Sequence, residues 1–388
     1  MAFRVLKLIK CSNTLKNTTI YIIFYKISIE LKHHFYKNLQ KILPSSSEKV
    51  ARSLAKNQDK KLKLIYLKEH EKEIKKRANY DLADFLNLSK DIPYHITPEK
   101  YKPNDFYYNA LTLKKYAGIN ESSFISATME HGSYLADDYY WDSDINFPFN
   151  TIIVNSNLRK NVLSKACNKN IEVVGPYIAY AQSLLTASQV QKEKKRLGKN
   201  LLVFPMHSTH WIDVNYNIQE FIKQINHIAK EFNSVRICMY WKDILRGDYK
   251  PYKEEGFEIV CAGHIYEPHF LPRLRSLIEI SDHTMSSQAG TQLCYSIYLD
   301  RPHLLYQNDS ELVVHLDEIK NDTDNRAKKV ADGNNFKEIH AVFSEFSSGI
   351  TKEQYNVVDK YWGISSVKSK EELRDLLLNV RKIGKLTT

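Results

Sequence analysis

Four short polar segments follow apolar runs of strand length in the second half of the chain. Pro205–His210 follows the first run, Trp241–Asp243 the second, Gly263–Pro268 the third and Ser286–Thr291 the fourth. Because ligands bind beyond the carboxyl ends of parallel strands, we expect these segments to meet at one edge of a sheet. Backbone N–H groups at a helix start hold phosphate, hydroxyls add hydrogen bonds, and a carboxylate can hold a ribose. The spacing therefore predicts a site for a phosphorylated ligand that carries a sugar.

The residues predicted to bind this ligand are His207, Ser208, Gly263, His264, Glu267, Ser286, Ser287, Gly290 and Thr291. Gly290 lets the backbone approach a ligand closely, and His207 and His210 flank one loop. Structural interpretations stay open for the same residues. Hydroxyl groups before a helix also serve as caps, histidines at strand ends are often hydrogen-bonded structural residues, and Glu267 also favours a helix N-terminus electrostatically.

A second group of candidate residues lies at the end of an earlier strand. Glu130 and His131 begin a polar loop, and either of them, or the two as a dyad, is predicted to act as general base on an acceptor hydroxyl. The alternative is a polar turn without chemistry. Asp142-Ser143-Asp144 formally matches a metal-binding D-x-D motif, but we interpret it as part of a solvated acidic loop. No cofactor or metal is required by this interpretation.

Hydrophobic periodicity places these residues in an alternating α/β fold. Strands are expected at residues 122–127, 151–154, 171–176, 201–204, 235–241, 257–262, 282–286 and 303–306. Helices are expected at residues 158–167, 188–198, 218–232, 271–278 and 291–299, and from 369 onward. This rhythm implies mainly parallel sheets. We predict two Rossmann-like lobes: a basic helical extension over 1–100, an acceptor lobe over 101–185, a donor lobe over 186–340, and helices over 341–388 that pack back.

Charge is unevenly distributed along the 388 residues. The net charge is +11, but residues 1–77 hold 19 Lys/Arg and 6 Asp/Glu, or +13, which leaves 11 − 13 = −2 for the rest. This distribution does not favour nucleic acid as partner, and it favours a basic arm on an anionic membrane surface. No apolar stretch reaches the roughly 18–20 residues that span a bilayer. Five scattered cysteines without a CxxC pair indicate a reducing compartment, and Cys238 and Cys261 are expected to be core residues.

The C-terminal half resembles the donor domain of GT-B glycosyltransferases. The resemblance rests on Phe257–His264, Ile280-Ser281-Asp282, the Ser286–Thr291 turn before a helix, and Arg301-Pro302. His207 and the Ser286-Ser287 pair are also similar to motifs of bacterial sialyltransferase-like enzymes of this fold, where they hold a cytidine nucleotide. One departure is that His207 is followed by Ser208 rather than by proline. The resemblance implies a donor lobe built on these segments and an acceptor lobe that supplies the general base.

These observations predict a glycosyltransferase, of hexosyl or sialyl type, that moves a sugar from a nucleotide-sugar donor to a glycan or glycolipid acceptor in lipopolysaccharide or capsule assembly. We expect a cytoplasmic location, peripheral at the inner face of the plasma membrane, with residues 1–77 on the anionic surface. Two alternatives remain open: a CDP-polyol phosphotransferase of the same fold, and a non-catalytic module that binds membrane or nucleic acid.

Overall fold

The computed structural model divides the chain into two compact units, Met1–Lys68 and Glu69–Thr388. It describes residues 68, 70–90, 92, 97–132, 135, 138–209, 212–315, 323, 330 and 333–385, with side chains described as far as 380. Most of the basic extension predicted over residues 1–100, up to residue 67, and His210 lie outside the described residues. All features below belong to the second unit.

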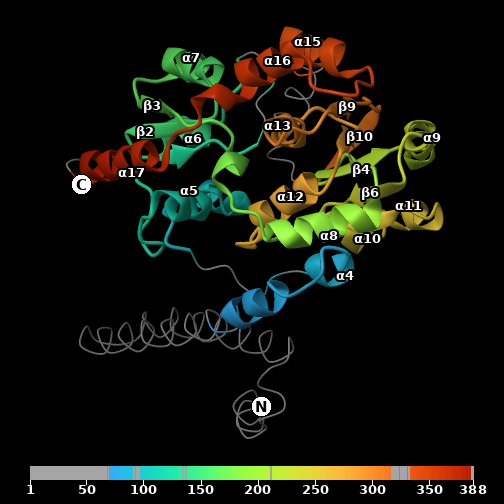
Figure 1. The fold of residues 1–388 in the computed structure, drawn as a ribbon. Helices are drawn as coiled ribbons and strands as arrows, with labels where there is room; N and C mark the ends of the chain where they lie inside the picture. Colours follow the sequence, from blue (N-terminus) through green and yellow to red (C-terminus); the bar gives the residue numbers. More distant parts are fainter. Residues whose placement is uncertain are drawn as a thin grey trace, which may run out of the picture. The chain divides into compact units, whose positions relative to one another are not determined.

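A five-stranded parallel sheet forms the C-terminal lobe (Figure 1). Its strands are β4 (Asn200–Phe204), β6 (Ser234–Cys238), β7 (Glu258–Val260), β8 (His283–Ser286) and β9 (His303–Leu305). Their spatial order is β7-β6-β4-β8-β9. Strands β6 and β7 therefore lie on one side of β4, and β8 and β9, which come later in the chain, lie on the other side. This is the strand order of a doubly wound sheet, and its switch point lies between β4 and β8.

Helices cover both faces of this sheet because alternate strand residues point to opposite sides. Leu202 and Phe204 belong to a core with α12 (Phe270–Glu279), α13 (Thr291–Tyr298) and α15 (Asn334–Phe343). Their neighbours Leu201 and Val203 belong to a second core, which also contains residues of α9 (Ile218–Ala229), α10 (Trp241–Arg246) and α11 (Lys250–Glu254). Strand β4 is thus buried on both faces, which explains its continuous apolar run Leu201–Phe204.

The N-terminal lobe holds a smaller parallel sheet in the order β1 (Thr128–Met129), β2 (Thr151–Val154) and β3 (Asn170–Val173). Residues of β2 and β3 pack against Leu163 of α7 (Asn157–Ala166). A 3-10 segment, η1 (Lys102–Tyr108), leads into α5 (Asn109–Ala117). The strand expected at 122–127 is wrong, because that segment is a turn and the strand begins at Thr128. The predicted class, α/β with two Rossmann-like lobes, is confirmed by these two parallel sheets.

The C-terminal helices return to the N-terminal lobe. Helix α16 (Lys352–Trp362) packs on both α7 and α13, and α17 (Lys370–Lys385) packs on α5. The turn between them contains Gly363, whose φ of +66° is left-handed and whose added Cβ would lie 2.3 Å from the carbonyl oxygen of Asn155. Only glycine allows this close approach.

Residues 70–90 pack on the α/β body as well. The Arg77 side chain is buried and donates to the Leu88 and Lys90 carbonyls, and α4 (Phe85–Leu88) lies against α10. The body therefore begins about 30 residues before the boundary predicted at 100, since helical periodicity does not reveal what a helix packs on.

Polar residues cap the starts of several helices. Ser156 caps α7, and Ser369 and Glu372 form a capping box at the start of α17, as their spacing in the sequence predicts. The capping box of α8 (Ala187–Leu197) uses Thr186 and Gln189, two residues before Ser188 and Gln191, which have the same spacing in the sequence. An antiparallel ribbon of β5 (Ile212–Tyr216) and β10 (Ser310–Val314) was not anticipated. Among the residues described, we find no helix of sufficient length and apolarity to cross a bilayer.

Candidate functional site

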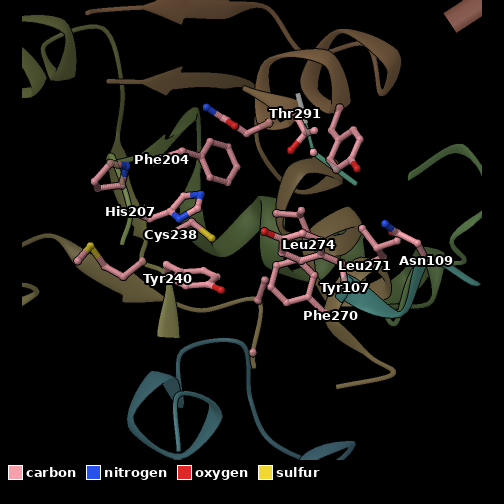
Figure 2. A pocket seen from close by; sticks show the side chains of 17 residues that line it. Tyr107, Asn109, Phe204, His207, Cys238, Tyr240, Phe270, Leu271, Leu274 and Thr291 are labelled. Atoms are coloured by element: carbon pink, nitrogen blue, oxygen red, sulfur yellow. The ribbon is translucent and has the colours of Figure 1, made fainter. Parts of the chain in front are cut away.

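One pocket lies at the carboxyl edge of the five-stranded sheet, at its switch point. Its empty volume is about 800 Å³, including space open to solvent. Its walls are formed by Phe204 and Pro205 at the end of β4, Cys238 at the end of β6, and Ala262 after β7. The remaining lining residues are Tyr107, Asn109, Gly132, His207, Met239, Tyr240, Gly263, Phe270, Leu271, Leu274, Thr291, Gln292 and Tyr295 (Figure 2). Ligands of open parallel sheets bind at this edge.

Three of the predicted binding residues line the pocket: His207, Gly263 and Thr291. The His207 ring lies 4.6 Å from the Tyr240 ring, and its Nδ1 is 2.9 Å from the Ser208 carbonyl oxygen. Gly263 has a φ of +102°, and an added Cβ would meet the Glu267 carboxylate at 2.5 Å. Thr291 is the first residue of α13, a helix whose N-cap, Gly290, supplies no side-chain cap. The start of α13 thus lies at the pocket without a side-chain cap, which suits anion binding.

The serine pair before α13 does not line the pocket. Ser286 and Ser287 are both fully buried. The Ser286 Oγ lies 2.9 Å from His303 Nε2, and the Ser287 Oγ accepts a hydrogen bond from the Met206 N–H at 2.6 Å. The Ser287 hydroxyl thus joins the loops that follow β4 and β8, and the Ser286 hydroxyl joins β8 to β9. Because both hydroxyls have protein partners and neither residue lines the pocket, this arrangement does not support the prediction that they contact the donor.

Ser208 and His264 are also inside the protein. The Ser208 N–H donates to both carboxylate oxygens of Asp243, at 3.1 and 3.2 Å, and its Oγ accepts from Arg246 at 2.9 Å. His264 is buried with its ring 4.1 Å from the Trp241 ring. Neither residue is among those that line the pocket, so their predicted contacts with the donor are not supported by this arrangement.

Glu267 forms a buried ion cluster instead of facing a ribose. Its carboxylate is fully buried, 2.6 Å from Arg273 Nη2 and 3.6 Å from Arg77 Nη1. Arg273 also donates to the Ala262 carbonyl at 2.8 Å. The cluster therefore fixes the loop after β7 to the segment that contains Arg77, and its carboxylate is directed to two guanidinium groups.

On the acceptor side, the two candidate bases have different surroundings. The Glu130 side chain is 1% exposed and pairs with buried Arg159 at 2.5 Å. Burial raises the pKa of the Glu130 carboxyl, and Arg159 opposes part of that rise. His131 is partly exposed, its ring packs edge-on against Phe106 at 4.7 Å, and the following Gly132 lines the pocket. Neither residue is among those that line the pocket, and of the two His131 is the more exposed.

The D-x-D match is not a solvated loop. Asp142–Asn146 form the short helix α6, in which Asp142 is exposed but Asp144 is fully buried. The Tyr101 hydroxyl donates a hydrogen bond to the Asp144 side chain, and burial raises the pKa of the Asp144 carboxyl to about 7. Within the described ranges, no three His, Cys, Asp or Glu side chains are grouped so as to hold a metal ion. Cys238 and Cys261 are buried, as expected.

Several lining residues were not predicted, among them Tyr107, Asn109, Tyr240 and Gln292. Tyr240 follows β6 and Gln292 lies in the first turn of α13, so both could have been found from their positions at a strand end and a helix start. Burial raises the pKa of Tyr107 to about 12 and that of Tyr240 well above its usual value, so both hydroxyls stay protonated as hydrogen-bond donors at neutral pH. No sequence signal places Tyr107 and Asn109, which come from the other lobe.

Comparisons with known proteins gave only distant structural matches. No family model matches the sequence, and no curated protein matches it. Among solved structures, the wall teichoic acid polymerase TagF is 13% identical, with a TM-score of 0.35 over 69% of each chain. A UDP-GlcNAc 2-epimerase of Methanocaldococcus jannaschii, in complex with UDP-GlcNAc and UDP, is 10% identical, with a TM-score of 0.36 over 67% of this chain and 68% of that one. S. aureus MnaA with UDP is 10% identical, with a TM-score of 0.35 over 71% of this chain and 72% of that one.

Proposed function

We propose that the protein is a glycosyltransferase that binds a nucleotide-sugar in the pocket at the switch point and transfers its sugar to a hydroxyl of a glycan or glycolipid. The observation that carries the proposal is the start of α13, which faces a pocket walled by both lobes. The N–H groups and dipole of α13 would hold the donor diphosphate beside Thr291. The rings of Tyr240 and His207 would form a wall for a flat or cyclic group, as is common in ligand pockets.

In the proposed reaction His131 is the general base. An inverting transfer needs a group that takes the proton of the acceptor hydroxyl as that oxygen attacks the sugar. Imidazole is suited to this step because its ordinary pKa lies near neutrality. Glu130 would act indirectly: its ion pair with Arg159 holds the end of β1, and its carbonyl accepts the Tyr177 hydroxyl at 2.7 Å.

The binding part of the proposal is tested by thermal unfolding of the full chain with CMP, CDP, UDP, GDP and their sugar conjugates. A ligand that binds only the folded state adds about 2.7 kcal/mol of stability at a hundred times its Kd, so the midpoint rises. A midpoint unmoved by every nucleotide would refute the donor site. CDP-glycerol is also tested as a donor in a separate turnover assay. If the protein turns over CDP-glycerol and no nucleotide-sugar, it is a polyol phosphotransferase instead.

The catalytic part is tested with the donor that binds. We expect His131→Ala to lower transfer by about 10²–10⁴-fold, the usual contribution of general base catalysis, without weakening donor binding. Glu130→Gln is the matched variant, and we expect it to lose stability first because it removes the charge opposite buried Arg159. Binding without turnover in the wild-type protein would indicate a binding module rather than an enzyme.

For the cellular setting, we propose surface-glycan assembly at the inner face of the plasma membrane; the +13 balance of residues 1–77 supports the membrane part of this proposal. Deletion of residues 1–43 is expected to weaken cosedimentation with vesicles that contain anionic lipid. Unchanged cosedimentation of the shortened protein would contradict a membrane role for that segment.

A further inference from the structure

The Asn109 side chain is a buried amide with an unused acceptor. The residue is 2% exposed, lines the pocket, and its Oδ1 has no hydrogen-bond partner among the described residues (Figure 2). Buried polar atoms in folded proteins nearly always have a partner, so an exception inside a pocket points to a ligand that supplies one. An amide oxygen accepts a hydrogen bond, and its complement is a hydroxyl or N–H group.

The backbone that delivers Asn109 to the pocket is unusual. In the described part of the chain three residues other than glycine have a positive φ, and two of them, Tyr107 at 57° and Tyr108 at 55°, directly precede Asn109. The Tyr107 N–H donates to the Ile265 carbonyl of the other lobe at 3.0 Å, and its ring lies 5.0 Å from the Phe270 ring. The strained turn is thus held by contacts with the C-terminal lobe. Left-handed backbone in bulky residues persists where surrounding contacts enforce it, and such residues cluster at ligand sites.

The lobes contribute different polar groups to the pocket. The C-terminal lobe contributes the start of α13, with Thr291 and Gln292. The N-terminal lobe contributes the neutral amide of Asn109, at the first position of α5. In Figure 2 Asn109 lies on the far side of Tyr107 and Leu274 from His207 and Tyr240. A donor whose diphosphate lies at α13 and whose base lies toward Tyr240 would extend its sugar in the direction of Asn109.

We propose that Asn109 is a specificity-determining residue whose Oδ1 accepts a hydrogen bond from a hydroxyl of the donor sugar, so that the N-terminal lobe recognises a neutral hexose. The inference rests on the proposed function, since it assigns the sugar of the nucleotide-sugar to this residue. It does not depend on which nucleotide the donor carries.

The test compares bare nucleotides with their glucose conjugates on the full chain. UDP, GDP, ADP and CDP, and the corresponding nucleoside diphosphate glucoses, are titrated calorimetrically into wild type and Asn109→Leu. We expect the variant to bind the conjugate about tenfold more weakly while its affinity for the bare nucleotide stays unchanged, because one neutral hydrogen bond is lost. Equal affinities in the two proteins, or equal losses for nucleotide and conjugate, would overturn the inference and leave the proposed function intact. If wild type binds neither nucleotide nor conjugate, the proposed function fails and the inference fails with it.

A second measurement separates a ligand contact from a structural one. Asn104 lies five residues earlier in η1, is fully buried, and has both amide groups satisfied: it donates to the Ala127 carbonyl and accepts from the Met129 N–H, both at 2.9 Å. We expect Asn104→Leu to lower the melting temperature, since two backbone groups lose their partner, and Asn109→Leu to leave it equal or raise it. A fall for Asn109→Leu as large as that for Asn104→Leu would contradict the assignment, because it would show that the amide stabilises the free protein.

Discussion

Replacement of Glu267 by alanine separates the structural role seen here from the ribose-binding role expected from sequence. The carboxylate is fully buried between Arg273 at 2.6 Å and Arg77 at 3.6 Å, and both arginine side chains are at most 1% exposed. Its removal leaves the buried Arg273 guanidinium without a counter-charge, whereas Arg77 keeps its ion pair with Glu73 at 3.0 Å. A buried charge that loses its partner costs about 3–5 kcal/mol. We therefore expect Glu267→Ala to lower the free energy of unfolding by about that amount, measured by urea denaturation.

The matched control for this substitution is Glu258→Ala. Glu258 pairs with Arg196 at 3.2 Å, but the Arg196 side chain is 51% exposed, and an exposed pair contributes only about 0–1 kcal/mol. Nucleotide binding is then measured at a temperature where both variants are folded. If Glu267→Ala is as stable as the control and yet binds no nucleotide, Glu267 does not act through the ion cluster, and the ribose-binding role is correct. If stability falls and binding survives, the structural role is established.

Three further perturbations test other parts of the structure. Burial raises the pKa of Asp144 from 3.8 to about 7, so the folded state holds a proton that the unfolded state releases, and the free energy of unfolding should fall as the pH rises from about 4 to 7. Asp144→Asn should remove that pH dependence, measured by urea unfolding at pH 5 and pH 8. Ser286→Ala removes the contact with His303 and should lower the free energy of unfolding by about 1–2 kcal/mol, with unchanged nucleotide affinity. Thr291→Ala should instead weaken nucleotide binding without loss of stability. The reverse pattern would support the role expected for Ser286 from the sequence. Gly363→Ala should lower the melting temperature by several degrees, because its Cβ would lie 2.3 Å from a backbone carbonyl, and an unchanged midpoint would show that the turn can relax.

Much of the fold could be predicted because its strands are buried on both faces. Continuous apolar runs such as Leu201–Phe204 leave little ambiguity, and β2 has the bounds expected from Thr151–Val154. Prediction failed where an element lacked such a run. The β5–β10 ribbon mixes polar and apolar residues and is largely exposed or half-buried. Its pairing joins segments almost a hundred residues apart, which local periodicity does not detect.

The site was predicted less well than the fold, for a physical reason. Sequence shows which polar residues follow a strand but not whether their groups are already used. Ser287 illustrates this: a hydroxyl at a strand end can meet a ligand or satisfy a neighbouring backbone N–H, and here it holds the N–H of Met206. Chain crossings at the edge of a parallel sheet create many such N–H groups, and buried ones need partners.

The same reasoning shows what the pocket offers to a ligand. Ser286 and Glu267 at the sheet edge already have protein partners, and they do not line the pocket. Two of the groups that do line it are the start of α13, which has no side-chain cap, and Asn109, whose Oδ1 has no hydrogen-bond partner among the described residues. One comes from each lobe, so a ligand that satisfies both must bridge the lobes. That requirement favours a donor with a diphosphate at one end and hydroxyl groups at the other, and it predicts that Thr291 and Asn109 substitutions reduce affinity for such a donor through different parts of the same molecule.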